Sequence, residues 1–441
     1  MTERPGARMI TMWGAVALGV GSMVGAGIFA LMGVAAAKAG SAVWLSFLGA
    51  GVIALLTGHS FARLGVRYPS RGGVVEYLVK AYGVGLFSGG CSILFYIAQL
   101  IGMAMISLAF GKFAAELLGI GEDLPFWERV LASGLILGLT VLNLVGSRLV
   151  SKAQGMIVLF NLVILAGFSL ALSWHAQVER LSVETWPAAA PLLGSLALTF
   201  FAFTGFAVIS NAAEEMENPA RDLPRAMYTA ITIVIVLYVG LALAIVGAVS
   251  PEQLASGGAT LLAEAARAYF GEVGFTVLLI SAIVSSVTCL NAGLFGVTSI
   301  TFTLAQNGQL PQRFEREIRA STRGLTISAM LALLMVNFLT LTTVASLGSA
   351  TSLLVYSLVN LGALRLFGQK GWSGRLIVLS VVACLAAILI WVLYTLRTSP
   401  GSLLTFLSFL VIAFLSEGLL QRFMGRRILS RREWRDQSTP N

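Results

Sequence analysis

Long apolar stretches that carry almost no charge constrain this sequence more than any other feature. Stretches 231–249 and 327–341 are examples. A helix needs about 20 apolar residues to cross a bilayer, and several stretches reach that length with their apolar flanks. Open strands cannot satisfy their backbone polar groups in lipid, so we expect membrane-spanning helices.

Composition and hydropathy extend this expectation to the whole chain. Only 11% of the 441 residues are charged, against roughly 25% in soluble domains. The first apolar stretch is longer than the ~7–15 residues of a signal peptide, so we expect it to be retained. Breaks in hydropathy predict an all-α polytopic membrane protein of twelve spans, at 11–36, 42–62, 86–118, 130–147, 154–173, 193–215, 226–249, 272–304, 325–343, 345–366, 375–396 and 401–421.

The basic residues predict an orientation. The formal net charge is +9, but these residues occupy alternate loops rather than one soluble face, which argues against nucleic acid as a partner. If the N-terminus is cytoplasmic, 23 of the 29 Lys and Arg residues fall on cytoplasmic segments. Cytoplasmic loops are enriched in Lys and Arg, so we expect both termini in the cytoplasm. The basic tail, 422–441, also suits contact with anionic membrane lipid.

Enzyme chemistry finds no support in the sequence. The three cysteines, Cys91, Cys289 and Cys384, are dispersed in apolar spans and form no metal-binding pattern with the two histidines. The chain has no nucleotide-binding loop and no nucleophile motif. A membrane solute sensor is the alternative from another class, but the short loops and tail leave no room for a soluble output domain.

Glycine clusters mark two spans as candidates for interrupted helices, whose free backbone groups bind solutes and ions near the bilayer midplane. The first span has four glycines within 19–27, and the sixth has Gly205 after the aromatic run 200–203. Amides at 25–27 favour a carboxylate, and carbonyls at 21–24 and 203–205 suit an ammonium group, so together they predict a site for a zwitterion. The alternative is that these glycines only allow helices to pack closely.

The positions of these two spans predict an inverted repeat. Spans one and six correspond if 1–173 forms a first half of five helices and 193–366 a second half. Spans eleven and twelve, within 375–421, then follow as an appendix, and 422–441 is the tail.

Several motifs resemble those of the amino acid–polyamine–organocation permeases. Val24-Gly25-Ala26-Gly27-Ile28-Phe29 resembles the signature of their first span. The run 200–206, followed by 211–226, resembles their sixth span and its cytoplasmic exit, and 68–73 and 304–311 resemble two of their loops. The similarity covers spans one to ten and is specific as a set.

The resemblance implies the 5+5 inverted-repeat fold of the leucine-transporter type, in the cytoplasmic (inner) membrane of a prokaryote. It also implies a substrate held by its α-carboxylate and α-amino group. Backbone amides of Ala26 and Gly27 would bind the carboxylate, with the turn permitted by Gly25. The other substrate-binding positions carried over are carbonyls of Met23, Phe203 and Thr204, the neighbouring Gly205, the closing aromatic Phe201, and the span-three side chains Gln99 and Met103.

Two departures from the family pattern bear on ion coupling. Many members have Glu after the Gly-Phe pair of span six, where this chain has Ala207. Many prokaryotic members have Lys midway along span five, where this chain has Asn161. A coupling role for those two charged groups is therefore excluded here.

Sodium is one candidate for the coupled ion. Ala282, Ser285 and Ser286 on span eight match an arrangement that binds sodium in relatives, together with span-one carbonyls at Gly21 and Val24. Hard cations prefer oxygen ligands, although a membrane Ser often bonds its own helix instead. Facilitated diffusion, exchange and a proton path stay open, and no other cofactor is expected.

The expected substrate is a neutral or small polar amino acid. Gln99 is the only strongly polar side chain among the pocket positions, and none of them is acidic or basic. An amine or polyamine carrier is the runner-up, which the missing acidic residue disfavours. The sequence leaves the oligomeric state open.

Overall fold

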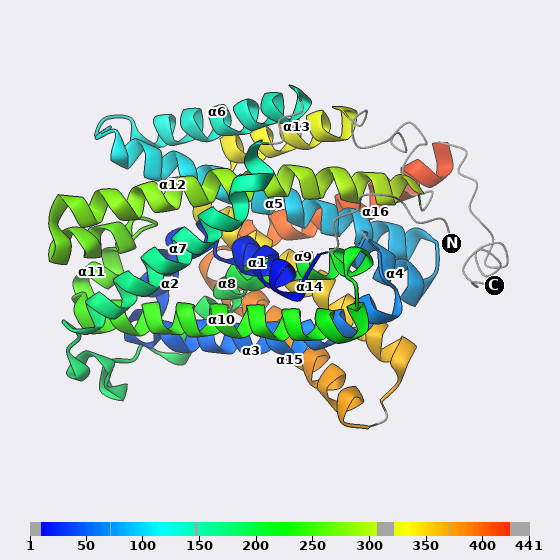
Figure 1. Ribbon diagram of the computed structural model, residues 1–441, viewed down its shortest axis with the longest axis horizontal. Helices are drawn as coiled ribbons and strands as arrows, with labels where there is room; N and C mark the ends of the chain where they lie inside the picture. Colours follow the sequence, from blue (N-terminus) through cyan, green and yellow to red (C-terminus); the bar gives the residue numbers. More distant parts are fainter. Residues whose placement is uncertain (1–9, 71, 146–148, 307–321, 370, 424–441) are drawn as a thin grey trace.

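The computed structural model describes residues 10–423 except 71, 146–148, 307–321 and 370, and these ranges are helical apart from turns and one isolated bridge between Ile10 and Met216. Most helices run side by side along the long axis of the molecule (Figure 1). In chain order they are α1 (Met12–Met23), α2 (Ala26–Ala39), η1 (Gly40–Ala42), α3 (Val43–Arg67), α4 (Val74–Tyr82), α5 (Leu86–Leu117), α6 (Leu124–Val145), α7 (Leu149–Ser173), η2 (Val178–Leu181), η3 (Val183–Thr185), α8 (Ala189–Thr199), η4 (Phe200–Phe206), α9 (Ala207–Asn211), η5 (Ala213–Glu215), α10 (Pro219–Ala248), α11 (Pro251–Ser256), α12 (Leu261–Gln306), α13 (Thr322–Phe338), α14 (Leu341–Phe367), α15 (Gly371–Thr398) and α16 (Pro400–Phe423).

The helices follow the apolar stretches of the sequence. Among the described residues, ten helical segments are long and apolar enough to cross a membrane, and Met12–Met23 and Gly324–Phe338 are shorter apolar helices. Each expected span contains a helix, while the count of twelve spans and the inverted repeat stay predictions. The boundary between the ninth and tenth spans was placed too late, because Thr340 caps α14 by accepting a hydrogen bond from the Thr343 amide at 3.3 Å.

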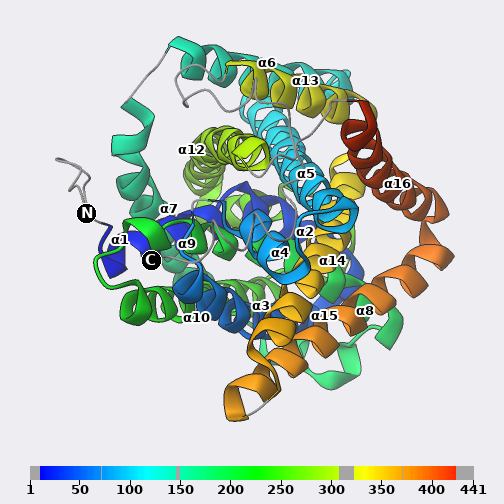
Figure 2. The same cartoon turned by 90° about the vertical axis from the view of Figure 1, so that its right-hand side faces the viewer.

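The helices form an inner group and an outer group. Viewed along the bundle, α2, α5, α12 and α14 lie inside, while α6, α13, α15 and α16 lie at the rim (Figure 2). The most apolar window of α14 is 78% buried, whereas that of α16 is only 17% buried. An apolar helix face without protein cover is stable in lipid but not in water, so the rim is the lipid-facing surface.

Three short α-helical segments of the described chain fall outside the expected spans. α4 turns six of its nine residues, among them Tyr77, into the protein. α11 and the first part of α12 precede Gly271, whose φ is 64°. This positive φ makes a kink at Gly271, which separates residues 261–270 from the rest of α12. The expected start of the eighth span at 272 agrees with this kink.

Several sequence predictions concern residues outside the described ranges. Residues 307–311 of the loop motif 304–311 lie outside the described ranges, and so do residues 424–441 of the tail 422–441. Some of the basic residues counted in the charge analysis, such as Arg4, Arg8 and Arg313, also lie outside the described ranges.

Candidate functional site

The first expected span is interrupted within its glycine cluster. α1 ends at Met23, where Val24 leaves the helix with ψ of 40°, and α2 begins after Gly25 with ψ of −158°. The first four amides of an α-helix have no partner within that helix. The free amides at the start of α2 therefore face the interruption, and the helix dipole gives this end a partial positive charge.

The sixth expected span also loses its α-helical winding, but differently from the prediction. Phe200–Phe206 is wound as the 3₁₀ helix η4 between α8 and α9 instead of being unwound at 203–205. A 3₁₀ helix keeps i to i+3 hydrogen bonds, so fewer carbonyls are released than an extended segment would release. One carbonyl of η4, that of Phe201, accepts a hydrogen bond from the Thr204 hydroxyl at 2.8 Å.

The two interrupted regions are in direct contact through Gly205. A Cβ at Gly205 would lie 2.5 Å from the Ser22 carbonyl carbon and oxygen and 2.7 Å from the Met23 nitrogen. Only a residue without a side chain permits this approach. Gly205 thus sets the distance between η4 and the end of α1.

Two buried tyrosines occupy carbonyls that were predicted to receive the ammonium group. Tyr238 on α10 donates to the Met23 carbonyl at 2.6 Å, and Tyr356 on α14 donates to the Thr204 carbonyl at 2.9 Å. A carbonyl oxygen has two lone pairs, so each can accept one further donor. Sequence reasoning missed both tyrosines, because nothing in their local sequence indicates these distant partners.

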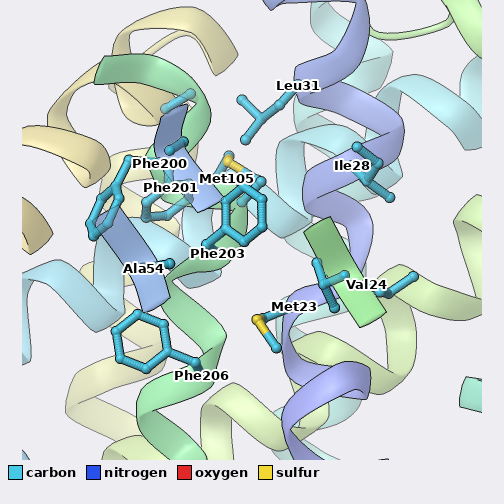
Figure 3. Close-up of a cluster of buried hydrophobic side chains, with 14 of the residues drawn as sticks. Met23, Val24, Ile28, Leu31, Ala54, Met105, Phe200, Phe201, Phe203 and Phe206 are labelled. Atoms are coloured by element: carbon cyan, nitrogen blue, oxygen red, sulfur yellow. The ribbon is translucent and has the colours of Figure 1, made fainter. Parts of the chain in front are cut away.

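The predicted side chains lie around the same region. In Figure 3, Met23, Met105 and Phe203 lie between the ribbon of α1 and α2 and that of η4. A Cβ at Gly27 would be 3.9 Å from both the Ala202 Cα and the Met105 Cε, so Gly27 faces η4 and α5.

The remaining pocket positions belong to α5 and its neighbours. Phe201 packs against Gly348 on α14, where a Cβ would be 2.5 Å from the ring. Met103 contacts Gly293 on α12 and is buried. Gln99 lies one helical turn before Met103 and is half-buried.

α12 borders the other side of the interruption. Ser285 donates to the Val24 carbonyl at 3.1 Å, whereas Ser286 donates to the Ala282 carbonyl of its own helix at 2.6 Å. A Cβ at Gly25 would be 2.6 Å from the Cys289 sulfur, a contact that the sequence did not suggest. Gly21 packs against Val158 of α7 instead. The structure thus brings Ser285 to Val24, while Gly21 contacts a different helix.

Asn161 pairs with the same helix. The Ser281 hydroxyl donates to the Asn161 Oδ1 at 2.5 Å, and both side chains are buried. A neutral hydrogen-bonded pair therefore lies between α7 and α12 at the position where the resemblance implied a Lys.

The site is built from backbone dipoles and uncharged side chains. No group of three or more His, Cys, Asp or Glu residues that could hold a metal occurs in the part of the chain that the structure describes. The polar groups of this region are backbone amides and carbonyls, and its buried side chains are mostly apolar or aromatic.

Comparison with known proteins gives a family match over most of the chain. The family described as amino acid permease matches residues 10–417. An inner membrane transport protein of Escherichia coli K12, YbaT, is 33% identical over 82% of this chain and 84% of that protein. The serine/threonine exchanger SteT of Bacillus subtilis is 28% identical over 67% of this chain and 68% of that protein. The methylthioribose transporter of Bacillus subtilis is 25% identical over 96% of this chain and 94% of that protein.

Proposed function

Since this chain belongs to the amino acid permease family, we propose that it carries a neutral or small polar amino acid across the cytoplasmic membrane by alternating access. It is a multi-pass membrane transporter of the amino acid–polyamine–organocation type. What we propose beyond this class is the substrate, the residues that bind it and the ion that is coupled to its transport.

The contact between the interrupted first helix and η4 carries this proposal. The free amides of α2 provide a positive end for a carboxylate, and the carbonyls of Met23 and Thr204 provide acceptors for an ammonium group. The close approach of Gly205 to the Ser22 backbone keeps these amides and carbonyls near one another. Amides on one side and carbonyls on the other match the two charged groups of an α-amino acid.

The side chains favour an uncharged substrate side chain. Of the expected pocket positions, Gln99 has the most polar side chain, and the others are apolar, aromatic, hydroxyl or glycine. A cationic or acidic side chain would lack a counter-charge in a region of low dielectric, which is unfavourable. The name of the relative SteT, a serine/threonine exchanger, agrees with a small polar amino acid, whereas another relative is named for a different solute, methylthioribose.

Sodium is the coupled ion that we infer, carried as cargo with the amino acid. The observation in its favour is the contact between Ser285 and the Val24 carbonyl, which places two oxygen atoms 3.1 Å apart at the interruption. The Ala282 carbonyl, one helical turn before Ser286, and the Ser286 hydroxyl are two further oxygen atoms of α12, and in this structure they bond to each other. Proton-driven uptake and exchange are the competing modes.

Uptake into proteoliposomes tests the substrate first. Labelled amino acids of neutral, acidic and basic classes are offered, together with a polyamine, while sodium and proton gradients are imposed separately. We expect saturable uptake of a neutral amino acid that an inward sodium gradient drives. Uptake of the polyamine alone would contradict the proposed substrate class.

The variant Ser285→Ala then tests the ion. It should lose the sodium dependence, whereas Ser92→Ala should keep it, because the buried Ser92 hydroxyl bonds to the Ser88 carbonyl of its own helix. If only a proton gradient or preloaded amino acid drives uptake, sodium coupling is wrong while the substrate assignment survives.

A further inference from the structure

A polar cavity lies at the end of the bundle where α2 and α15 finish and α14 and α16 begin. Its volume is ≈ 60 Å³, which admits a few water molecules, because one water needs about 10–15 Å³ by this measure. Hydroxyl groups from Thr343, Ser346 and Thr395 line it, together with the Lys38 ammonium and the rings of Trp391 and Tyr394. Among the residues that the structure describes, no carboxylate lines it.

Lys38 brings a positive charge to this cavity without a counter-charge. Its ammonium lies 5.3 Å from the centroid of the Tyr394 ring, and no ion pair or hydrogen bond to it occurs among the residues described in the structure. Tyr394 is held in turn against α8, where a Cβ at Gly194 would lie 2.8 Å from the ring. A cation–π contact compensates only part of the lost hydration of a half-buried ammonium.

Further donor groups belong to residues that line the same cavity. The Trp391 indole N–H donates to the Ser346 hydroxyl oxygen at 2.9 Å. Ser346 makes no other side-chain hydrogen bond among the described residues, so its own hydrogen is available to an acceptor. Thr343 belongs to the first turn of α14, whose dipole adds partial positive charge at this end.

We propose that this cavity is a binding site for a small anion, either free chloride or the carboxylate of a small acid. The Lys38 ammonium supplies the counter-charge, the Ser346 and Thr395 hydroxyls donate hydrogen bonds, and the Tyr394 ring positions Lys38. The small volume suits such an anion better than a whole lipid or a peptide. Because Lys38 is in the last turn of α2, the bound anion fixes that end of α2 against α14 and α15.

Thermal unfolding of the purified full-length protein in detergent tests this site without any transport step. The melting temperature is measured against sodium chloride, sodium formate and sodium gluconate at constant ionic strength. We expect a saturable rise with chloride or formate and none with gluconate, which is too large for the cavity. Chloride alone identifies the inorganic ion as the ligand, and formate alone identifies a carboxylate.

Three variants decide whether the response belongs to this cavity. Lys38→Met should abolish it, and Thr395→Val, which preserves the side-chain shape, should weaken the apparent affinity by on the order of tenfold. Arg397→Met removes a neighbouring exposed cation that does not line the cavity, and it should respond like the wild type.

The proposal is wrong if the melting temperature of the wild type shows no saturable rise with chloride or formate. It is also wrong if the Lys38→Met and Thr395→Val proteins respond to these anions like the wild type. If Lys38→Met does not fold, Thr395→Val alone decides. Amino acid uptake is read separately, so failure of the anion site and failure of the proposed transport function are distinguishable.

Discussion

At the scale of single residues, Gly27 offers the most direct test of the substrate site. A Cβ at this position meets its nearest neighbours at 3.9 Å, which is an ordinary contact. Gly27→Ala should therefore keep most of the uptake, whereas Gly27→Leu should reduce the initial rate about 100-fold or more by filling the carboxylate position. Uptake is normalised to folded protein in the membrane. Normal transport by Gly27→Leu would exclude the proposed carboxylate site.

Tyr238 is a second residue whose role can be measured. Its hydroxyl donates to the Met23 carbonyl inside a fully buried aromatic contact with Phe203. Tyr238→Phe leaves that carbonyl without its donor, which costs about 1–3 kcal/mol and loosens the end of α1. We expect a lower melting temperature and about tenfold lower uptake efficiency. Tyr96→Phe is the matched control, because Tyr96 bonds Ser328 on α13 instead. An equal effect of both substitutions would contradict a specific role for Tyr238.

The interruption between α1 and α2 was predictable from the sequence, whereas the tyrosines that contact the site were not. Glycines at 25 and 27 form a local pattern, so the position of the interruption followed from the residues. Tyr238 and Met23 are 215 residues apart, and Tyr356 and Thr204 are 152 residues apart. Such pairs depend on how the helices pack and rotate, which hydropathy does not contain.

At the scale of elements, Gly205 couples η4 to α1. A Cβ there would lie 2.5 Å from backbone atoms of Ser22, and backbone cannot move without displacing the helix. Gly205→Ala should therefore destabilise the protein by about 1–3 kcal/mol, measured by thermal unfolding in detergent. Gly134→Ala on α6 is the control, since nothing lies within 4 Å of its Cβ position and alanine favours a helix. Wild-type stability of Gly205→Ala would show that the two segments can separate freely.

Hydropathy predicts the long helices but neither the winding of η4 nor the presence of α4. The long helices were predictable because an uninterrupted apolar run in lipid has to be helical. The 3₁₀ winding of η4 was not, because it depends on tertiary contacts such as those of Gly205 and Tyr356 rather than on glycine alone. α4 was missed because its buried face is part of a short amphipathic segment, which a search for long apolar runs does not detect.

At the scale of the whole molecule, the division into inner and rim helices was not predictable from the sequence. α15 has the highest mean hydropathy of the candidate spans, 3.1, yet only 28% of that window is buried, while α14 has 1.4 and 78%. Hydropathy measures preference for an apolar surrounding, and lipid and protein both provide one. The inner helix α14 tolerates polar residues such as Ser349 and Asn360 because protein partners bond them.

At the same scale, the orientation of the molecule in the membrane is predicted from the distribution of Lys and Arg alone. The distribution of 23 of the 29 basic residues on one set of loops predicts cytoplasmic termini. It therefore predicts that exposed Gln253 of α11 faces outward and exposed Gln369, after α14, faces inward. In a variant without Cys91, Cys289 and Cys384 that still transports, Gln253→Cys should react with a membrane-impermeant maleimide on intact cells. Gln369→Cys should react only after permeabilisation. The reverse pattern would invert the topology and place the anion cavity beside Lys38 on the cytoplasmic side, because that cavity and α11 are predicted to lie on the same side of the membrane.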